Sequence, residues 1–314
     1  MTTPPVDPRS PLRILAGPTA VGKTALALAL AERHGAAIIS ADSMQVYRGI
    51  PIGTAQPTAA ELARVPHHLV GHWEPGREYN VALFVEQANA VLDACQRLGQ
   101  PVLVCGGTGL FLKHLIQGIF PGAPRSDEIR ARLQEELDAH GPAALRERLR
   151  LVDPRREAEI NPNDTMRVLR ALEVYELTGR PMSEHHADDA GQRRPRAAHY
   201  VVLTRERDAL NSRIEQRVDA SLAAGWLDEA RWLMELGLPD NAQACKALGY
   251  RELFRVLRGE WSLEEATAEI KKQTRRFAKR QRTWFRSVAG ATWIGLDGLT
   301  PEEALEKADA VLFP

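Results

Sequence analysis

Cysteine is scarce in this sequence. Only three of the 314 residues are cysteines, Cys95, Cys105 and Cys245, and no Cys-x-x-Cys pair occurs. An odd number of widely spaced thiols predicts neither a disulfide framework nor a zinc cluster. We therefore expect the cysteines to be small buried side chains of a protein in a reducing compartment.

Long apolar runs are also missing. No stretch approaches the roughly 18 residues of a membrane-spanning helix, and the first residues, MTTPP, show no basic region followed by an apolar one. Hydrophobic residues nevertheless make up 44% of the chain, which is enough for a sizeable core. These features predict a globular cytoplasmic protein that neither enters a membrane nor is exported.

Net charge is absent as well, because 41 Lys and Arg residues balance 41 Asp and Glu residues. The basic residues are unevenly distributed, since eight of the sixteen residues from Lys271 to Arg286 are basic and none is acidic. We interpret this basic stripe as a surface that follows a nucleic-acid backbone, with a solvated face and a membrane-surface helix as alternatives. On a helix with about 100° per residue, the stripe separates from an apolar face of Ile270, Phe277, Trp284, Phe285 and Val288.

The most specific local pattern lies near the amino terminus. An apolar stretch at 14–16 leads into a loop with two glycines, and an Ala/Leu-rich helical run follows at 25–31. Such a loop turns backbone N–H groups inward, while its lysine adds a mobile positive charge and its threonine hydroxyl can hold Mg²⁺. The pattern does not decide whether the phosphates belong to a nucleotide. The predicted phosphate loop consists of Gly17, Pro18, Thr19, Ala20, Val21, Gly22, Lys23 and Thr24.

Strand and helix patterns alternate in the first part of the chain and again near its end. Apolar strand patterns at 36–40, 101–105 and 200–203 are separated by helical patterns. This alternation predicts an α/β fold with a parallel sheet and helices on both faces, like that of P-loop NTPases. Ligands of such sheets bind at the carboxyl ends of the strands. The phosphate loop, Asp42 and Thr108 follow three of these ends, so we expect them to converge.

The middle of the chain contains no strand pattern between about residues 123 and 190 and predicts an inserted all-helical domain. Ser126 and Asn163-Asp164 are helix-start signals, and Gly141-Pro142 marks a break. The stretch from His185 to Arg196 is interpreted as a loop that returns to the core. The predicted domains are a first part of the core at 1–122, the helical insertion at 123–198, and the completion of the core with the basic helix at 199–314.

Asp42 is the one acidic residue at a predicted strand end in the first part of the core. The five residues after it, SMQVY, offer hydrogen-bonding and stacking groups that would suit a heterocycle beside a carboxylate. We therefore consider Asp42 a candidate general base. Capping of the next turn is the alternative, and a role linked to Mg²⁺ stays open.

Six segments occur in an order that resembles the bacterial tRNA dimethylallyltransferase family, also called tRNA isopentenyltransferases or IPP transferases. They are GPTAVGKT, ADSMQVYRGIPIGTAQP, VCGGTGLF, RIEQRV, KALGYRE and TRRFAKRQRTWF, and they extend over nearly the whole chain. The resemblance implies transfer of a dimethylallyl group from its diphosphate to N6 of the adenosine immediately 3′ of the anticodon, with release of diphosphate. It also implies that the helical insertion clamps the anticodon arm of the tRNA.

The resemblance adds residues to the predicted diphosphate site. In the family, a threonine and an arginine that match Thr108 and Arg217 contact the diphosphate, and Arg213 is a weaker candidate. Lys23, the loop N–H groups and Mg²⁺ on Thr24 would neutralise the charge of the departing diphosphate. The alternative for Arg217 is a surface pair with an acidic neighbour on its own helix.

The resemblance also places tRNA contacts in several short segments. The target base must leave its stack to enter the site, so contacts elsewhere on the RNA have to offset the unstacking. Met166 stands where glutamine is common in the family, and Gln56 where lysine is common. The implied contacts are Asp42, Ser43, Met44, Gln45, Thr108, Arg130, Met166, Arg167, Val168, Leu169, Arg170, Lys246, Ala247, Leu248, Gly249, Tyr250, Arg251, Thr274, Arg275, Arg276, Phe277, Ala278, Lys279, Arg280 and Gln281.

Two other function classes fit parts of the pattern. A small-molecule or nucleoside kinase also uses a phosphate loop, a carboxylate and a helical lid, but it has no need of a basic helix far from the loop. A regulatory module that binds a nucleotide and touches RNA without modifying it is the third class. Nothing in the sequence demands a dimer, so we expect a monomer. The histidine pairs at 67–68 and 185–186 lack partner ligands, which leaves Thr24 with Mg²⁺ as the predicted metal contact.

Overall fold

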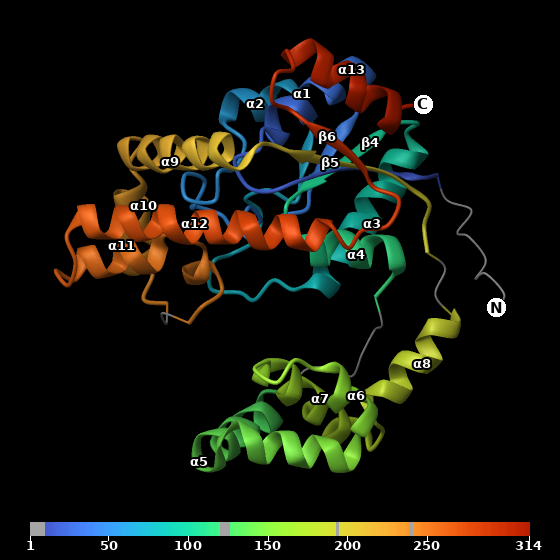
Figure 1. The fold of residues 1–314 in the computed structure, drawn as a ribbon, viewed down its shortest axis with the longest axis vertical. Coiled ribbons are helices and arrows are strands. Elements are labelled where there is room, and N and C mark those ends of the chain that lie inside the picture. The colour runs from blue at the N-terminus through green and yellow to red at the C-terminus, as the bar shows by residue number, and fades with distance from the viewer. Residues whose placement is uncertain (1–9, 120–125, 193–194, 239–240) are drawn as a thin grey trace. The chain divides into compact units, whose positions relative to one another are not determined.

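The computed structural model describes residues 10–119, 126–192, 195–238 and 241–314. The chain divides into two compact units, one at Gly118–Pro195 and the other at Val6–Gln117 with Arg196–Pro314. Figure 1 shows the helices and strands of both units. The domain boundary that we predicted between residues 122 and 123 lies outside the described residues.

The larger unit is built on one sheet of six strands in which every neighbouring pair is parallel, so the predicted fold class is confirmed. The strand order is β3-β2-β4-β1-β5-β6. The central strands are buried on both faces, as is typical of a parallel sheet covered by helices. The strands are β1 (Leu12–Ala16), β2 (Ala37–Ser40), β3 (His67–His68), β4 (Val102–Gly106), β5 (Ala198–Thr204) and β6 (Thr292–Gly295).

Helices cover both faces of this sheet (Figure 1). Helices α1 (Lys23–His34) and α13 (Pro301–Leu312) lie together on one side, and α3 (Val81–Arg97) and α4 (Gly109–Gln117) lie on the other. The unit also contains α2 (Ala59–Arg64), α9 (Arg207–Ala223), α10 (Trp226–Glu235), a 3-10 turn (Ala244–Lys246), α11 (Tyr250–Leu257) and α12 (Leu263–Phe285).

The predicted basic helix belongs to α12, which begins at a capping box formed by Ser262 and Glu265. Its buried face differs in part from the prediction, because Phe277 and Trp284 are only half-buried. Steps of three and four residues instead bring small and polar side chains to the core, and Phe277 is left to line a cavity described below. The buried residues of α12 are Ala266, Ile270, Thr274, Ala278, Gln281 and Phe285.

The regular elements of the smaller unit are all helices in its described residues, and the unit has a hydrophobic core of its own, in which Leu133, Leu145, Leu149 and Leu172 are fully buried. The predicted helix starts at Ser126 and Asp164 are confirmed by side-chain capping bonds. The helices are α5 (Asp127–Val152), which is interrupted at Gly141 (φ 76°) as predicted, α6 (Pro154–Glu159), α7 (Thr165–Thr178) and α8 (Met182–Gln192).

The loop predicted from His185 to Arg196 is wrong for much of its length, because α8 continues to Gln192. Mixed charges and a glycine suggested a loop, but acidic residues of the helix pair with a base just before it. Arg180, which precedes α8, contacts Glu184 at 3.5 Å and Asp188 at 2.9 Å. These ion pairs tie the first two turns of α8 to the segment that leads into it.

Candidate active site

Two adjoining cavities lie at the carboxyl edge of the sheet, with volumes of about 570 and 340 Å³. The phosphate loop follows β1 there, Asp42 follows β2 and Thr108 follows β4, so the structure brings together the three groups that the strand pattern placed at this edge. The cavities form one site because they share Thr19, Asp42, Thr54, Ala55, Arg217 and Phe277.

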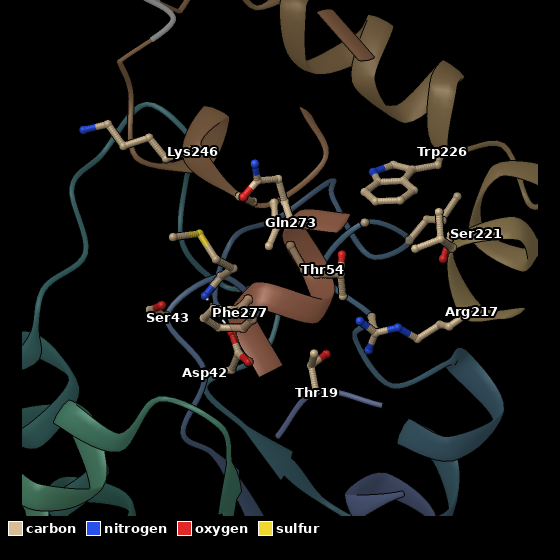
Figure 2. A pocket seen from close by; sticks show the side chains of 18 of the residues that line it. Thr19, Asp42, Ser43, Thr54, Arg217, Ser221, Trp226, Lys246, Gln273 and Phe277 are labelled. Atoms are coloured by element: carbon tan, nitrogen blue, oxygen red, sulfur yellow. Dashed lines mark hydrogen bonds between the residues drawn. The ribbon is translucent and has the colours of Figure 1, made fainter. Parts of the chain in front are cut away.

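The side chains around the larger cavity come from widely separated parts of the chain (Figure 2). Arg217 extends from α9 into the cavity, and Asp42 and Thr19 lie at its lower end in this view. Phe277 of α12 stands next to Asp42, and Trp226 of α10 closes the opposite end. The cavity therefore joins a polar floor to an aromatic wall.

The phosphate loop holds two glycines and one alanine in unusual backbone conformations. Gly17 has φ 150°, and a Cβ there would approach the carbonyl oxygen of Leu203 to 2.8 Å. Gly22 has φ 118°, and Ala20 between them has φ 63°, a conformation that costs a residue with a side chain about 1–3 kcal/mol. The Arg213 Nε donates to the carbonyl of Ala20 at 2.9 Å. Helix α9 therefore helps to hold the strained turn.

Other cationic side chains bind three further carbonyl groups of the loop. The Lys23 Nζ donates to the carbonyls of Gly17 and Pro18 at 2.9 and 2.8 Å, and the Arg205 Nε donates to that of Val21 at 3.0 Å. Among the residues that the structure describes, no side chain caps the start of α1, whose first N–H groups have no partner within the helix. The loop therefore turns its carbonyls to the protein and offers N–H groups to an anion.

Positive charge is concentrated in the smaller cavity. Burial lowers the pKa of Lys23 from 10.5 to about 8, against the opposing effects of Cys105 and Asp42. Burial also lowers the pKa of Arg217, and Asp42 opposes this shift too. An anion bound between Lys23 and Arg217 would favour both charged forms and raise both pKa values. The cavity thus has the electrostatics of a phosphate site.

Asp42 both caps a turn and faces the cavity. Its Oδ1 accepts hydrogen bonds from the N–H groups of Met44 at 2.9 Å and Gln45 at 3.4 Å. Thr108 braces the same turn, because its Oγ1 accepts from the N–H of Ser43 at 3.1 Å. Capping of this turn, which the sequence analysis gave as the alternative role of Asp42, is therefore confirmed. The capping bonds also orient the carboxylate toward the cavity.

Two glutamines near Asp42 brace the surrounding loops. The Gln45 Oε1 accepts from the Ser40 hydroxyl at 2.7 Å, and its Nε2 donates to the carbonyl of Ala55 at 2.7 Å. The Gln56 Nε2 donates to the carbonyl of Tyr47 at 2.7 Å. The Gln45 side chain, which the resemblance placed among the tRNA contacts, is thus bound within the protein.

The surface pair considered for Arg217 does not form. Its acidic neighbours bind α12 instead, Glu215 to Arg275 at 2.6 Å and Asp219 to Lys271 at 2.6 Å. Arg217 lines both cavities. These pairs also correct the interpretation of the basic stripe. The stripe contains no acidic residue, but acidic residues of α9 pair with two of its basic residues.

The basic stripe divides between two faces of α12. Thr274, Phe277 and Arg280 line the larger cavity. Ala278 and Gln281, predicted tRNA contacts, are 3% and 6% exposed and lie on the buried face instead, because the helix packs through its small and polar residues. A separate groove of about 500 Å³ on another face is lined by Arg207, Lys272, Arg275, Arg276, Lys279 and Arg282, among others.

Glu229 was missed by the sequence analysis. This carboxylate is 8% exposed and accepts hydrogen bonds from the N–H groups of Ile52 at 2.7 Å and Gly53 at 2.8 Å, and from the Tyr250 hydroxyl. It holds the loop that carries Thr54 and Ala55 into the site. No pattern in the sequence marked Glu229. In the structure Gly53 leaves no room for a side chain beside it, because a Cβ there would lie 2.1 Å from the Trp226 Nε1.

The KALGYRE segment is divided between cavity and core. Tyr250 is fully buried, so its side chain is a core residue and not the surface contact that the resemblance implied. Gly249 lies under Trp226, since a Cβ there would come within 2.3 Å of the indole ring. The residues of this segment that line the larger cavity are Lys246, Ala247, Leu248, Arg251 and Glu252.

The predicted contacts of the helical unit also divide between surface and core. Arg130 and Arg170 both bind the fully buried carboxylate of Glu173, at 3.1 and 2.8 Å. Met166 is 65% exposed, and Arg167 is exposed beside Asp164. Val168 and Leu169 are buried in the core of the unit, because they fall on the inner face of α7.

Clustered metal ligands were not predicted, and within the described part of the chain no group of three or more His, Cys, Asp or Glu side chains could hold a metal ion. Thr24 and Asp42 line the smaller cavity together and offer oxygen atoms. Separately, none of the described helices has the length and apolar character needed to cross a membrane.

Comparisons with known proteins agree along nearly the whole chain. A family model described as IPP transferase matches residues 45–288, and one described as isopentenyl transferase matches residues 10–69. The tRNA dimethylallyltransferase of Symbiobacterium thermophilum is 50% identical over 291 residues, which cover 92% of this chain and 90% of that protein. The tRNA dimethylallyltransferase of Syntrophobacter fumaroxidans is 46% identical over 288 residues, which cover 90% of this chain and 83% of that protein.

Solved structures show the same similarity. The tRNA isopentenylpyrophosphate transferase from Bacillus halodurans superimposes with a TM-score of 0.71 at 37% identity, over 96% of both chains. A eukaryotic dimethylallyltransferase described as acting on tRNA superimposes with a TM-score of 0.82 at 26% identity, over 96% of this chain and 78% of its own.

Proposed function

Because the chain belongs to the IPP transferase family and has tRNA dimethylallyltransferase activity, we propose that its phosphate loop holds the diphosphate of dimethylallyl diphosphate as a leaving group. The observation that carries this proposal is one cavity with Lys23, Arg217 and the loop N–H groups on one side and Asp42 beside them. The cations bind the departing diphosphate, and the carboxylate receives the acceptor amine.

The acceptor is N6 of the adenosine immediately 3′ of the anticodon. This amine is a poor nucleophile because its lone pair is delocalised into the ring. As N6 bonds to the allylic carbon, the carbon–oxygen bond breaks, its electron pair leaves with the diphosphate, and Asp42 accepts the proton from N6. Lys23, Arg217 and the loop N–H groups stabilise the negative charge that develops on the bridging oxygen.

The residues present fit a magnesium ion. Mg²⁺ prefers oxygen ligands, keeps several waters and commonly uses one or two protein ligands together with substrate phosphates. The Thr24 hydroxyl and the Asp42 carboxylate line the cavity that the diphosphate would occupy. When bound there, Mg²⁺ would neutralise diphosphate charge.

The tRNA is held by side chains at the wall of the larger cavity and beyond it. We assign this role to Lys246 and Arg251, which line the larger cavity, to the exposed basic residues of α12, and to Arg130, Met166 and Arg167 of the helical unit. Their contacts offset the cost of extruding the target base, on the order of a few kcal/mol. The expectations of a monomer and of a cytoplasmic location stay predictions.

The position of transfer can be tested with two RNAs. Radiolabelled dimethylallyl diphosphate is incubated with the protein, Mg²⁺ and either an unmodified tRNA or the same tRNA with guanosine in place of the adenosine next to the anticodon. Label should enter the first RNA only, and digestion should recover it on N6. Equal labelling of both RNAs would contradict the proposed acceptor.

The pKa of Lys23 predicts how diphosphate affinity depends on pH. In the ligand-free protein burial lowers this pKa to about 8, so the charged form that binds diphosphate predominates below pH 8 and is lost above it. We expect kcat/KM for dimethylallyl diphosphate to fall by up to about tenfold per pH unit above that value. A pH series at saturating tRNA measures this. Lys23→Arg, whose charge persists, should remove the fall, and a flat wild-type profile would refute the assignment.

The salt dependence of tRNA binding tests the exposed part of the basic stripe. Arg276 and Lys279 line the outer groove, and the described part of the chain places no carboxylate within ion-pair distance of either. Replacing both with alanine should weaken tRNA binding and reduce the slope of log K against log [salt] by about one to two. The control is Lys271→Ala, because Lys271 already pairs with Asp219. An unchanged slope in the double variant would mean that Arg276 and Lys279 face solvent and do not contact the tRNA backbone.

A further inference from the structure

Gln281 connects the basic helix to the phosphate loop. It lies on the buried face of α12 and is 6% exposed. Its Oε1 accepts from the N–H of Thr19 at 2.8 Å, and its Nε2 donates to the carbonyl of Gly107 at 3.0 Å. One side chain thus joins three segments that are far apart in the sequence.

Both ends of this contact belong to the diphosphate site. Thr19 is part of the phosphate loop, and Gly107 immediately precedes Thr108. Gly107 has to lack a side chain here, since a Cβ would approach the Gln281 Nε2 to 2.4 Å. The Thr19 N–H needs an acceptor and the Gly107 carbonyl needs a donor. The amide of a glutamine side chain provides both.

We propose that Gln281 is a positioning residue that fixes the phosphate loop and the Thr108 segment relative to α12. It does not contact the RNA in this role, although the resemblance placed it among the tRNA contacts, because its amide is bound by the two backbone groups. The inference rests on the proposed diphosphate site. It explains how the same helix that carries tRNA contacts can set the geometry of the donor site.

The first test uses inorganic diphosphate with Mg²⁺ as the probe, measured by calorimetry. Gln281→Leu leaves the Thr19 N–H and the Gly107 carbonyl without partners, so we expect the Kd for diphosphate to rise about tenfold. Affinity for unmodified tRNA should stay within about twofold, because the exposed basic residues are unchanged. The matched control is Thr283→Ala, since Thr283 is exposed on the same helix and bonds only to Lys279 of its own helix.

The second test uses Gln281→Glu, whose effect should depend on pH. The ionised carboxylate still accepts from Thr19, but it repels the Gly107 carbonyl and the diphosphate. When protonated, the same side chain donates to Gly107 and restores both bonds. The ratio of its diphosphate Kd to the wild-type Kd should therefore be large at about pH 8 and fall at least severalfold toward pH 5. A side chain with a general folding role would not give this pH-dependent rescue.

The outcomes separate this inference from the function on which it rests. If wild-type protein with Mg²⁺ does not bind inorganic diphosphate, the proposed diphosphate site itself fails. If wild type binds and both Gln281 variants bind equally well at each pH, only the positioning role is overturned. If tRNA affinity falls while diphosphate affinity is kept, Gln281 is an RNA contact and the inference is wrong.

Discussion

Asp42→Asn should lower kcat for prenyl transfer by roughly 10³-fold, within the range that a general base contributes, while tRNA affinity stays within about twofold. Asparagine keeps an oxygen that accepts from Met44, so the turn at the end of β2 is preserved. It cannot accept the proton that N6 loses as the carbon–nitrogen bond forms. Single-turnover kinetics with bound tRNA measure the rate of the chemical step without a contribution from product release, and steady-state kinetics measure kcat.

The control for this variant is Asp219→Asn. Asp219 is also a carboxylate near the basic helix, but it pairs with Lys271 and lines neither cavity. Its substitution should change kcat less than about twofold. If Asp42→Asn transfers the prenyl group at a rate close to that of wild type, the carboxylate is only a turn cap and the base lies elsewhere.

Arg217→Gln should lower kcat/KM for dimethylallyl diphosphate by about 10²- to 10³-fold, the cost of removing one donor to a developing oxyanion. Arg217 reaches both cavities, and its acidic neighbours on α9 are engaged by Arg275 and Lys271. The positive charge of Arg217 is therefore free to act on the diphosphate of the donor. Glutamine is polar but uncharged and too short to reach the same position, so the variant removes the charged donor from the site.

The measurement compares kinetic constants for the two substrates separately. KM for tRNA should change little in Arg217→Gln, while kcat and KM for the diphosphate donor carry the loss. Arg231→Gln serves as the control, since Arg231 is an exposed arginine of α10 that pairs with Asp228. A larger effect on KM for tRNA than for the donor would move Arg217 from the diphosphate site to the RNA surface.

The phosphate loop and Asp42 could be located from the sequence because their positions depend on local rules. Glycine at 17 and 22 supplies the backbone conformations of the turn, and the carboxyl ends of parallel strands meet at one edge. Arg217 is different, since it lies in a helix between Glu215 and Asp219, and no pattern in one helix tells which of these residues face a neighbour. Its place came from the family resemblance.

The side chains that shape the walls of the site were harder to predict. Glu229 looks like an ordinary helical glutamate, and only the fold brings it to the backbone of the 52–53 turn. The basic stripe was located correctly, but its pairing with α9 depends on the register of two helices. Helix α13 was not among the predicted elements, although Thr300, Pro301 and Glu303 form a capping signal at its start.

In the proposed reaction the phosphate loop binds a leaving group and not a phosphate donor. The direct measurement is transfer from labelled dimethylallyl diphosphate to unmodified tRNA with Mg²⁺ and no nucleoside triphosphate, with label in RNA and released diphosphate counted together. We predict one diphosphate released for each prenyl group transferred. Label that stays out of the RNA until ATP is added, with the γ-phosphate of ATP transferred to an acceptor, would contradict the account.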